Sequence, residues 1–91
     1  MAESKVQKQI IKHLENEGYY VVKVILCNKN GFPDLHFIKD GKAYYCEVKN
    51  KGKEPVPLQH HRMHELRQYG AVAVWADSLE MLKQKLYVTK N

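Results

Sequence analysis

The 91 residues are enough for one domain with a modest core, and we expect a single domain over residues 1–91. Fifteen Lys and Arg against ten Asp and Glu give a net charge of +5, a balance that suits a polyanionic partner but is also common in small proteins. No apolar run approaches the length of a membrane span and Met1 leads into polar residues, so we expect a cytoplasmic protein without a signal peptide or membrane contact.

The first predicted element is an amphipathic helix from Ser4 to Glu17, which Gly18 ends. Its apolar residues recur at helical spacing: Val6, Ile10, Ile11 and Leu14. Glu3 falls on the buried face of this helix, at its first turn. The carboxylate there either stabilises the helix N-terminus with its head in water or reaches in beside the sheet. Spacing alone favours the first interpretation.

The next segment, residues 19–28, is β-branched and nearly uninterrupted, which predicts a central strand. Gly31 and Pro33 then mark a loop. Cys27 lies in this apolar run and Cys46 in a later one. Two cysteines are too few for a disulfide framework, so we expect both to be buried free thiols.

A tight β-hairpin is predicted for residues 34–49. Two short apolar segments, 34–38 and 42–49, are joined by Asp40-Gly41, which is the strongest short-range signal for a two-residue hairpin loop. The position of this turn fixes the register, and therefore fixes which residues face each other across the two strands.

In this register two carboxylates lie on one face of the hairpin. Asp34 falls directly opposite Glu47, with Cβ atoms about 5 Å apart, and Lys49 shares their face because it lies two residues beyond Glu47. The other face is apolar and suited to pack against a helix. It carries Leu35, Phe37, Tyr44, Cys46 and Val48.

Residues 50–57 form a polar loop marked by Pro and Gly, which contains Lys51 and Lys53. A solvated connection is the ordinary interpretation of such a loop. Phosphate contact is the alternative, because the loop directly follows Lys49. A second helix is predicted for residues 58–69, with Gln59 facing the sheet near the helix start.

The second helix also carries His60, His61 and His64. His60 and His64 are spaced as zinc ligands on a helix are, but no H-E-x-x-H motif is present and no cysteine accompanies them. We instead expect an exposed helix face close to nucleic acid, with His60, His61 and Arg62 as candidate contacts.

The chain ends with a buried strand at residues 71–76 and a helix that Asp77 or Ser78 caps and that continues to about Leu86. The resulting order, αβββαβα, predicts an α/β sandwich with a mixed sheet, because a helix links the third and fourth strands.

The facing acids determine the expected chemistry. Without a partner, Asp34 and Glu47 would repel each other and one would take up a proton. Two carboxylates, a backbone carbonyl and water suit Mg²⁺ or Mn²⁺, and Lys49 could orient an attacking water or stabilise charge on a phosphate. The alternative is an ordinary surface arrangement, with Glu47 paired to Lys49 or Lys39. The joint spacing favours a metal site for phosphodiester hydrolysis.

These residues resemble a stand-alone VRR-NUC domain of the PD-(D/E)XK nuclease superfamily. Gly31-Phe32-Pro33-Asp34 matches the P-D half of the superfamily motif and Glu47-Val48-Lys49 matches the E-x-K half. Leu58-Gln59 and the order of elements extend the resemblance over essentially the whole chain. The resemblance implies a PD-(D/E)XK nuclease-like mixed sheet flanked by helices.

The resemblance also implies roles for single residues. Asp34 and Glu47 would be metal ligands, the Val48 carbonyl would add a third oxygen, and Lys49 would be the catalytic lysine. Glu3 matches the glutamate that family members carry on the first helix, and Gln59 matches the supporting glutamine of the second helix. Stand-alone members form homodimers that cut branched DNA such as four-way junctions.

We therefore predict a Mg²⁺- or Mn²⁺-dependent, structure-selective DNA endonuclease, acting as a homodimer and resembling a Holliday junction resolvase. Lys51, Lys53, His60, His61 and Arg62 are its candidate DNA contacts. One alternative is a non-catalytic nucleic-acid-binding module that retains the nuclease fold. Another is a nuclease directed to flaps or DNA ends. A third alternative, a restriction-type nuclease with base-specific contacts, is disfavoured because so short a chain shows no extra recognition segment.

Overall fold

The computed structural model describes residues 4–90, and side chains as far as residue 88. The elements follow the predicted order: α1 (Lys5–Asn16), β1 (Tyr20–Lys23), β2 (Leu35–Lys39), β3 (Lys42–Val48), α2 (Pro57–Gln68), β4 (Val72–Ala76) and α3 (Leu79–Lys90). Each helix has 12 residues, and none of the described helices is long and apolar enough to cross a membrane.

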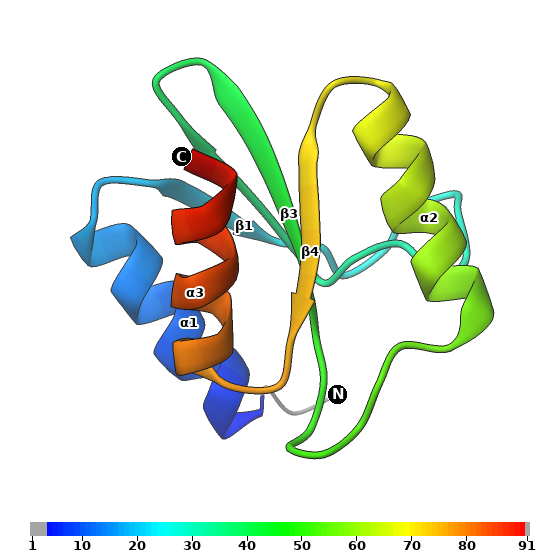
Figure 1. Ribbon diagram of the computed structural model, residues 1–91, viewed down its shortest axis with the longest axis horizontal. Helices are drawn as coiled ribbons and strands as arrows, with labels where there is room; N and C mark the ends of the chain where they lie inside the picture. The colour runs from blue at the N-terminus through cyan, green and yellow to red at the C-terminus, as the bar shows by residue number, and fades with distance from the viewer. Residues whose placement is uncertain (1–3, 91) are drawn as a thin grey trace.

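The strands form one mixed sheet in the order β1-β2-β3-β4 (Figure 1). The first three strands are antiparallel neighbours, whereas β3 and β4 run parallel. Parallel neighbours need a crossover connection, and α2 with its flanking loops supplies it. The predicted α/β fold with a mixed sheet is therefore confirmed.

The hairpin register also agrees with the prediction. Lys39 pairs with Lys42 and Leu35 pairs with Cys46. Asp40 and Gly41 both adopt positive φ, at 51° and 76°, as the two loop residues of a type I′ turn must. Asp34 directly precedes β2, and this register continued by one residue brings it opposite Glu47.

Helices cover both faces of the sheet (Figure 1). Ala76 pairs with Val48 and Ala73 pairs with Tyr45, so the side chains of the two alanines point to opposite faces. On the Ala76 face, α1 and α3 enclose the main core: Ile10, Leu14, Tyr19, Leu35, Phe37, Tyr44, Cys46, Ala76, Leu82 and Leu86. On the Ala73 face, α2 packs against β4 and Met63 is buried.

Hydroxyl side chains cap two helices. The Ser4 side chain accepts a hydrogen bond from the Gln7 amide at 3.0 Å, and Ser78 Oγ accepts one from the Met81 amide at 3.1 Å. Ser78, rather than Asp77, is therefore the cap of α3, and the helix continues past Leu86 to Lys90.

The prediction of a central strand at residues 19–28 is wrong. β1 has four residues and lies at the edge of the sheet. The Val24 amide still donates to the Asp34 carbonyl at 2.8 Å, but Ile25 and Leu26 are 79% and 92% exposed. Cys27 is exposed, which corrects the expectation of a buried thiol, whereas Cys46 is buried as expected. An apolar run fits a pleated strand at the edge or in the middle, so composition does not settle its position.

The loop before β2 makes a close approach to α2 at Gly31. Its φ is +78°, and a Cβ atom added there would lie 2.8 Å from Leu58 Cγ. Glycine is therefore favoured at this position for two reasons, the left-handed backbone and the close contact with Leu58.

Replacing Gly31 with alanine should lower the free energy of unfolding more than replacing Gly52 does. Gly52 has a similar φ of +83° with no atom within 4 Å of the added Cβ, so its variant isolates the backbone strain. We expect Gly31→Ala to cost about 1 kcal/mol more, the low end for overpacking, because Leu58 is partly exposed and can yield. Urea unfolding measures the unfolding free energy of both variants. Equal losses of unfolding free energy would show that the approach to Leu58 has no cost.

Candidate active site

Asp34 is held across the end of the hairpin. Its Oδ2 accepts a hydrogen bond from the Val48 amide at 3.0 Å, and its own carbonyl accepts one from the Val24 amide. Both the side chain and the backbone of Asp34 are thus fixed by neighbouring strands. The side chain of Glu47, on β3, belongs to the face of the sheet that α2 covers.

Glu47 is a buried acid, with 4% of its surface exposed. Its Oε2 accepts a hydrogen bond from Gln59 Nε2 at 3.0 Å, whereas its Oε1 is buried without a hydrogen-bond donor. The pKa of Glu47 is raised to about 8, first by burial and then by the negative charge of Asp34, while Lys49 acts in the opposite direction. The pair therefore needs either a shared proton or a cation.

Gln59 connects the acid pair to the lysine. Its side-chain amide donates to Glu47, and its Oε1 accepts from Lys49 Nζ at 3.3 Å and from the Val56 amide at 2.9 Å. Because Lys49 and the Val56 amide are both donors, only one orientation of the glutamine amide satisfies all three contacts. The start of α2 thereby fixes the carboxylate of Glu47.

Lys49 directly follows β3, and its amide donates to the Ala76 carbonyl at 2.9 Å, so the backbone is still held by β4. The structure brings most of the predicted catalytic and metal-binding residues together in one cluster: Asp34, Glu47, Val48, Lys49 and Gln59. Glu3, the other predicted ligand, lies outside the described residues.

The acid pair fits a divalent cation. Within residues 4–90, no group of three or more His, Cys, Asp or Glu side chains could hold a metal ion. An ion at the pair would therefore rest on two carboxylates, with oxygens from the backbone or from water completing the set. Mg²⁺ and Mn²⁺ accept such sites because they retain part of their hydration. The unpartnered Oε1 of Glu47 is the strongest sign of fit, since a buried acceptor without a donor is costly.

The predicted basic loop is anchored near the site. Lys51 and Lys53 are exposed in a turn closed by the Lys53 amide, which donates to the Asn50 carbonyl at 2.9 Å. The Gly52 amide donates to Asp77 Oδ2 at 3.0 Å, which ties the turn to the end of β4. The turn thus presents both lysines shortly after Lys49.

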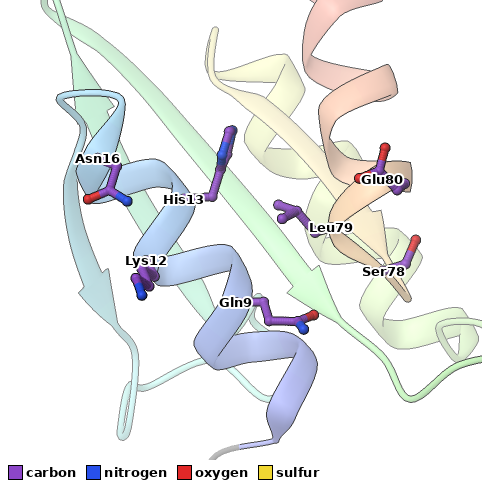
Figure 2. Close-up of a pocket in the computed structure, with 7 residues that line it drawn as sticks. All are labelled: Gln9, Lys12, His13, Asn16, Ser78, Leu79 and Glu80. Atoms are coloured by element: carbon purple, nitrogen blue, oxygen red, sulfur yellow. The ribbon is translucent and has the colours of Figure 1, made fainter.

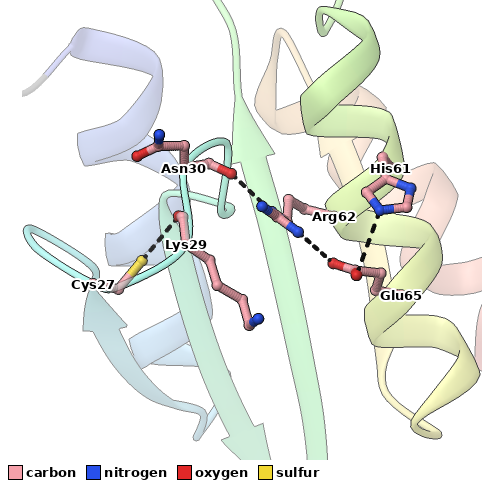
Figure 3. Close-up of polar contacts among 6 residues, drawn as sticks. All are labelled: Cys27, Lys29, Asn30, His61, Arg62 and Glu65. Atoms are coloured by element: carbon pink, nitrogen blue, oxygen red, sulfur yellow. Dashed lines mark hydrogen bonds and ion pairs between the residues drawn. The ribbon is translucent and has the colours of Figure 1, made fainter.

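The other predicted DNA contacts differ in their surroundings. His60 is exposed, but His61 Nε2 lies 3.4 Å from Glu65 Oε2 (Figure 3). The guanidinium of Arg62 donates to the Asn30 carbonyl and to Glu65 Oε1, each at 2.8 Å. The sequence did not reveal the contact between Arg62 and Asn30, because these residues are 32 apart along the chain. The Glu65 contacts lie at helical spacing, which could have indicated them.

Aromatic rings lie on the same face of the hairpin as the acid pair. His36 pairs with Tyr45, and their rings stack with centroids 4.5 Å apart. The Phe32 ring meets Tyr45 edge-on at 5.5 Å. The pKa of His36 is lowered by burial. These contacts hold the segment before Asp34 against β3.

A separate hollow of about 480 Å³ lies between α1 and the start of α3, on the sheet face opposite the acid pair. Figure 2 shows the side chains that line it: Gln9, Lys12, His13, Asn16, Ser78, Leu79 and Glu80. The carboxylates, the lysine and the glutamine described above lie elsewhere, so this hollow is not part of the candidate site.

Comparisons with known proteins bear on the family of the chain. The family model described as archaeal Holliday junction resolvase (Hjc) matches residues 3–88. A solved structure described as "VRR_NUC domain" is 26% identical, with a TM-score of 0.79 over 91% of each chain. Another, described as "VRR_NUC domain protein", is 26% identical, with a TM-score of 0.50 over 76% of this chain and 53% of its own. No curated protein matches. The VRR-NUC resemblance is confirmed.

The raised pKa of Glu47 predicts how the metal-free protein responds to pH. The folded-state pKa of about 8 exceeds the ordinary value of 4.5, so stability present at low pH is lost as pH rises between these values. We expect Glu47→Gln to remove this loss, which has a limiting slope of about 1.4 kcal/mol per pH unit.

Urea unfolding in EDTA between pH 5 and 8 measures the effect. The unfolding free energy of the wild type should fall relative to that of Glu47→Gln as the pH rises. The exposed-site control, Glu80→Gln, should follow the wild type. Parallel curves for the wild type and Glu47→Gln would show that Glu47 does not carry a raised pKa.

Proposed function

The chain belongs to the archaeal Holliday junction resolvase family, and we propose that it is a divalent-metal-dependent endonuclease that hydrolyses phosphodiester bonds in branched DNA. One observation carries the proposal: a buried glutamate with an unpartnered oxygen lies beside a second acid and is connected through Gln59 to Lys49. Structural ion pairs do not require this combination. It suits metal-dependent phosphodiester hydrolysis, in which two acids hold the ion and a lysine faces the phosphate.

Asp34 and Glu47 would hold the metal ion, Mg²⁺ or Mn²⁺, with the Val48 carbonyl as a candidate third oxygen. A bound ion of this kind polarises a phosphoryl oxygen and lowers the pKa of water. Gln59 fixes Oε2 of Glu47, while Oε1 accepts no hydrogen bond and is the candidate ligand atom. The Lys49 ammonium stabilises negative charge that develops on the phosphate and can orient the attacking water. Glu3 stays a candidate ligand.

A four-way junction is the substrate that we propose, because the matched family is described by its action on Holliday junctions. Resolving such a junction needs cuts in two strands related by symmetry, and a two-fold homodimer presents two identical sites. We therefore also propose that the chain acts as a homodimer. The cytoplasmic location expected from the sequence stays a prediction.

Alanine at Lys49 or Glu47 should reduce cleavage of a four-way junction at least about 100-fold, because each change removes charge stabilisation or a metal ligand at the site. The assay uses purified protein with Mn²⁺, and chelation with EDTA should stop the wild type. Lys8→Ala on exposed α1, which removes the same charge as Lys49→Ala, is the control and should cut normally.

Circular dichroism checks that each variant is folded, and junction affinity should change little. Undiminished cutting by both folded variants would rule out the proposed site. Wild-type protein that binds the junction but never cuts it in Mn²⁺ would instead indicate a binding module.

We propose that Lys51 and Lys53 contact phosphates. In the double variant Lys51→Gln/Lys53→Gln, the slope of log affinity against log salt should become shallower by about 2 per protomer, because each lost phosphate contact removes roughly 0.9. The matched control, Lys5→Gln/Lys8→Gln, removes the same charge from α1 and should keep the slope. Equal losses in the two double variants would indicate only a general effect of net charge.

A further inference from the structure

The loop that leads to Asp34, residues 28–33, is fastened to α2 and is termed here the approach loop. Arg62 Nε donates to the Asn30 carbonyl at 2.8 Å (Figure 3). Phe32 packs edge-on against Tyr45 of β3. The loop therefore reaches Asp34 with its backbone held by the helix and its aromatic side chain held by the sheet.

Arg62 is itself fixed by its neighbours on the helix. Its Nη1 donates to Glu65 Oε1 at 2.8 Å, and His61 lies against the other oxygen of the same carboxylate (Figure 3). The arginine side chain is 19% exposed. A carbonyl and a carboxylate thus take two of the five N–H donors of the guanidinium, and little of the side chain is open to a DNA phosphate.

Helix α2 contacts both Glu47 and the loop that leads to Asp34. Gln59 donates to Glu47 and accepts from Lys49, and Arg62, about one turn further along α2, holds the approach loop. A rigid helical turn thus sets the distance between the anchor of Glu47 and the anchor of the loop that ends at Asp34.

We propose that Arg62, held by Glu65, is a positioning residue that places Asp34 opposite Glu47 through the approach loop. The proposal rests on the proposed nuclease function and replaces the expectation that Arg62 contacts DNA. Losing the contact frees the approach loop, so that Asp34 is held only by its bonds from the Val48 and Val24 amides. The distance between the two acids then varies more than in the wild type. The rate of the chemical step and the affinity for the metal ion therefore fall, while the affinity for DNA does not change.

The first experiment compares Arg62→Ala with Arg67→Ala. Arg67 lies on the same helix and donates its Nε to the Ala73 carbonyl, away from the approach loop, so its loss matches the charge and the kind of contact. In Arg62→Ala we expect kcat for junction cleavage to fall about 10- to 100-fold, with the half-maximal Mn²⁺ concentration raised by a similar factor. KM and the salt slope of junction binding should not change.

A DNA contact at Arg62 predicts the reverse pattern. Junction affinity would fall, its salt slope would become shallower by about 1 per protomer, and kcat at saturating junction would be retained. That result would overturn the proposal. Arg62→Lys, which keeps the charge and one donor, should recover part of kcat if the Asn30 contact matters.

Glu65→Ala separates the two roles by the direction of its effect. If Arg62 positions the approach loop, removing Glu65 loosens Arg62 and lowers kcat in the same direction as Arg62→Ala. If Arg62 binds DNA, removing a carboxylate that competes for it tightens junction binding. Tighter binding with normal kcat would overturn the proposal.

Hydrogen exchange gives a measurement that does not need activity. The amides of Val24 and Val48, which donate to Asp34, should exchange faster in Arg62→Ala and Glu65→Ala than in the wild type. In Arg67→Ala they should exchange at the wild-type rate. Thermal unfolding shows whether each variant is folded. If the wild type cuts no junction, the proposed function fails, while exchange of these two amides and Mn²⁺ binding still decide the positioning role. Unchanged exchange in both variants would overturn it.

Discussion

The site depends on one unfavourable interaction, the burial of the Glu47 carboxyl beside a second acid. Burial and the charge of Asp34 both raise the pKa of Glu47, so ionising both acids requires a compensating positive charge. Most of the nearby polar contacts hold this pair in place: the Val48 amide fixes Asp34 and the Gln59 amide fixes Glu47. A protein with only structural needs would gain stability by replacing one of the acids. Under the proposed function, the unfavourable pair is retained because the metal ion compensates it.

Helix α2 holds the elements of the site in their relative positions. Because β3 and β4 are parallel, the connection between them must return along the sheet, and the returning helix starts beside the end of β3. Its first turn reaches Glu47 and Lys49 through Gln59, and its next turn reaches the approach loop through Arg62. The fold topology and the chemistry are therefore linked through one 12-residue helix.

The sequence was informative where structure is local. Asp40-Gly41 fixed a type I′ turn, and the two-residue period of a strand then carried the register along to Asp34 and Glu47. The helices were also located closely, since caps and periodicity are properties of adjacent residues. The strand at Tyr20–Lys23 was misjudged, because central or edge position depends on which other segments pair with it. The exposure of Cys27 follows from the same cause.

By itself, then, the sequence determined the fold class, the facing acids and the neighbouring lysine, because a tight turn and strand alternation place them without long-range information. The contact of Gln59 with the sheet followed from helical spacing. Only the tertiary structure decided how deeply Glu47 is buried, and therefore its raised pKa. It also decided that Arg62 meets Asn30 rather than solvent, because that contact joins segments far apart in the chain. Desolvation and long-range contacts arise only when the elements pack together.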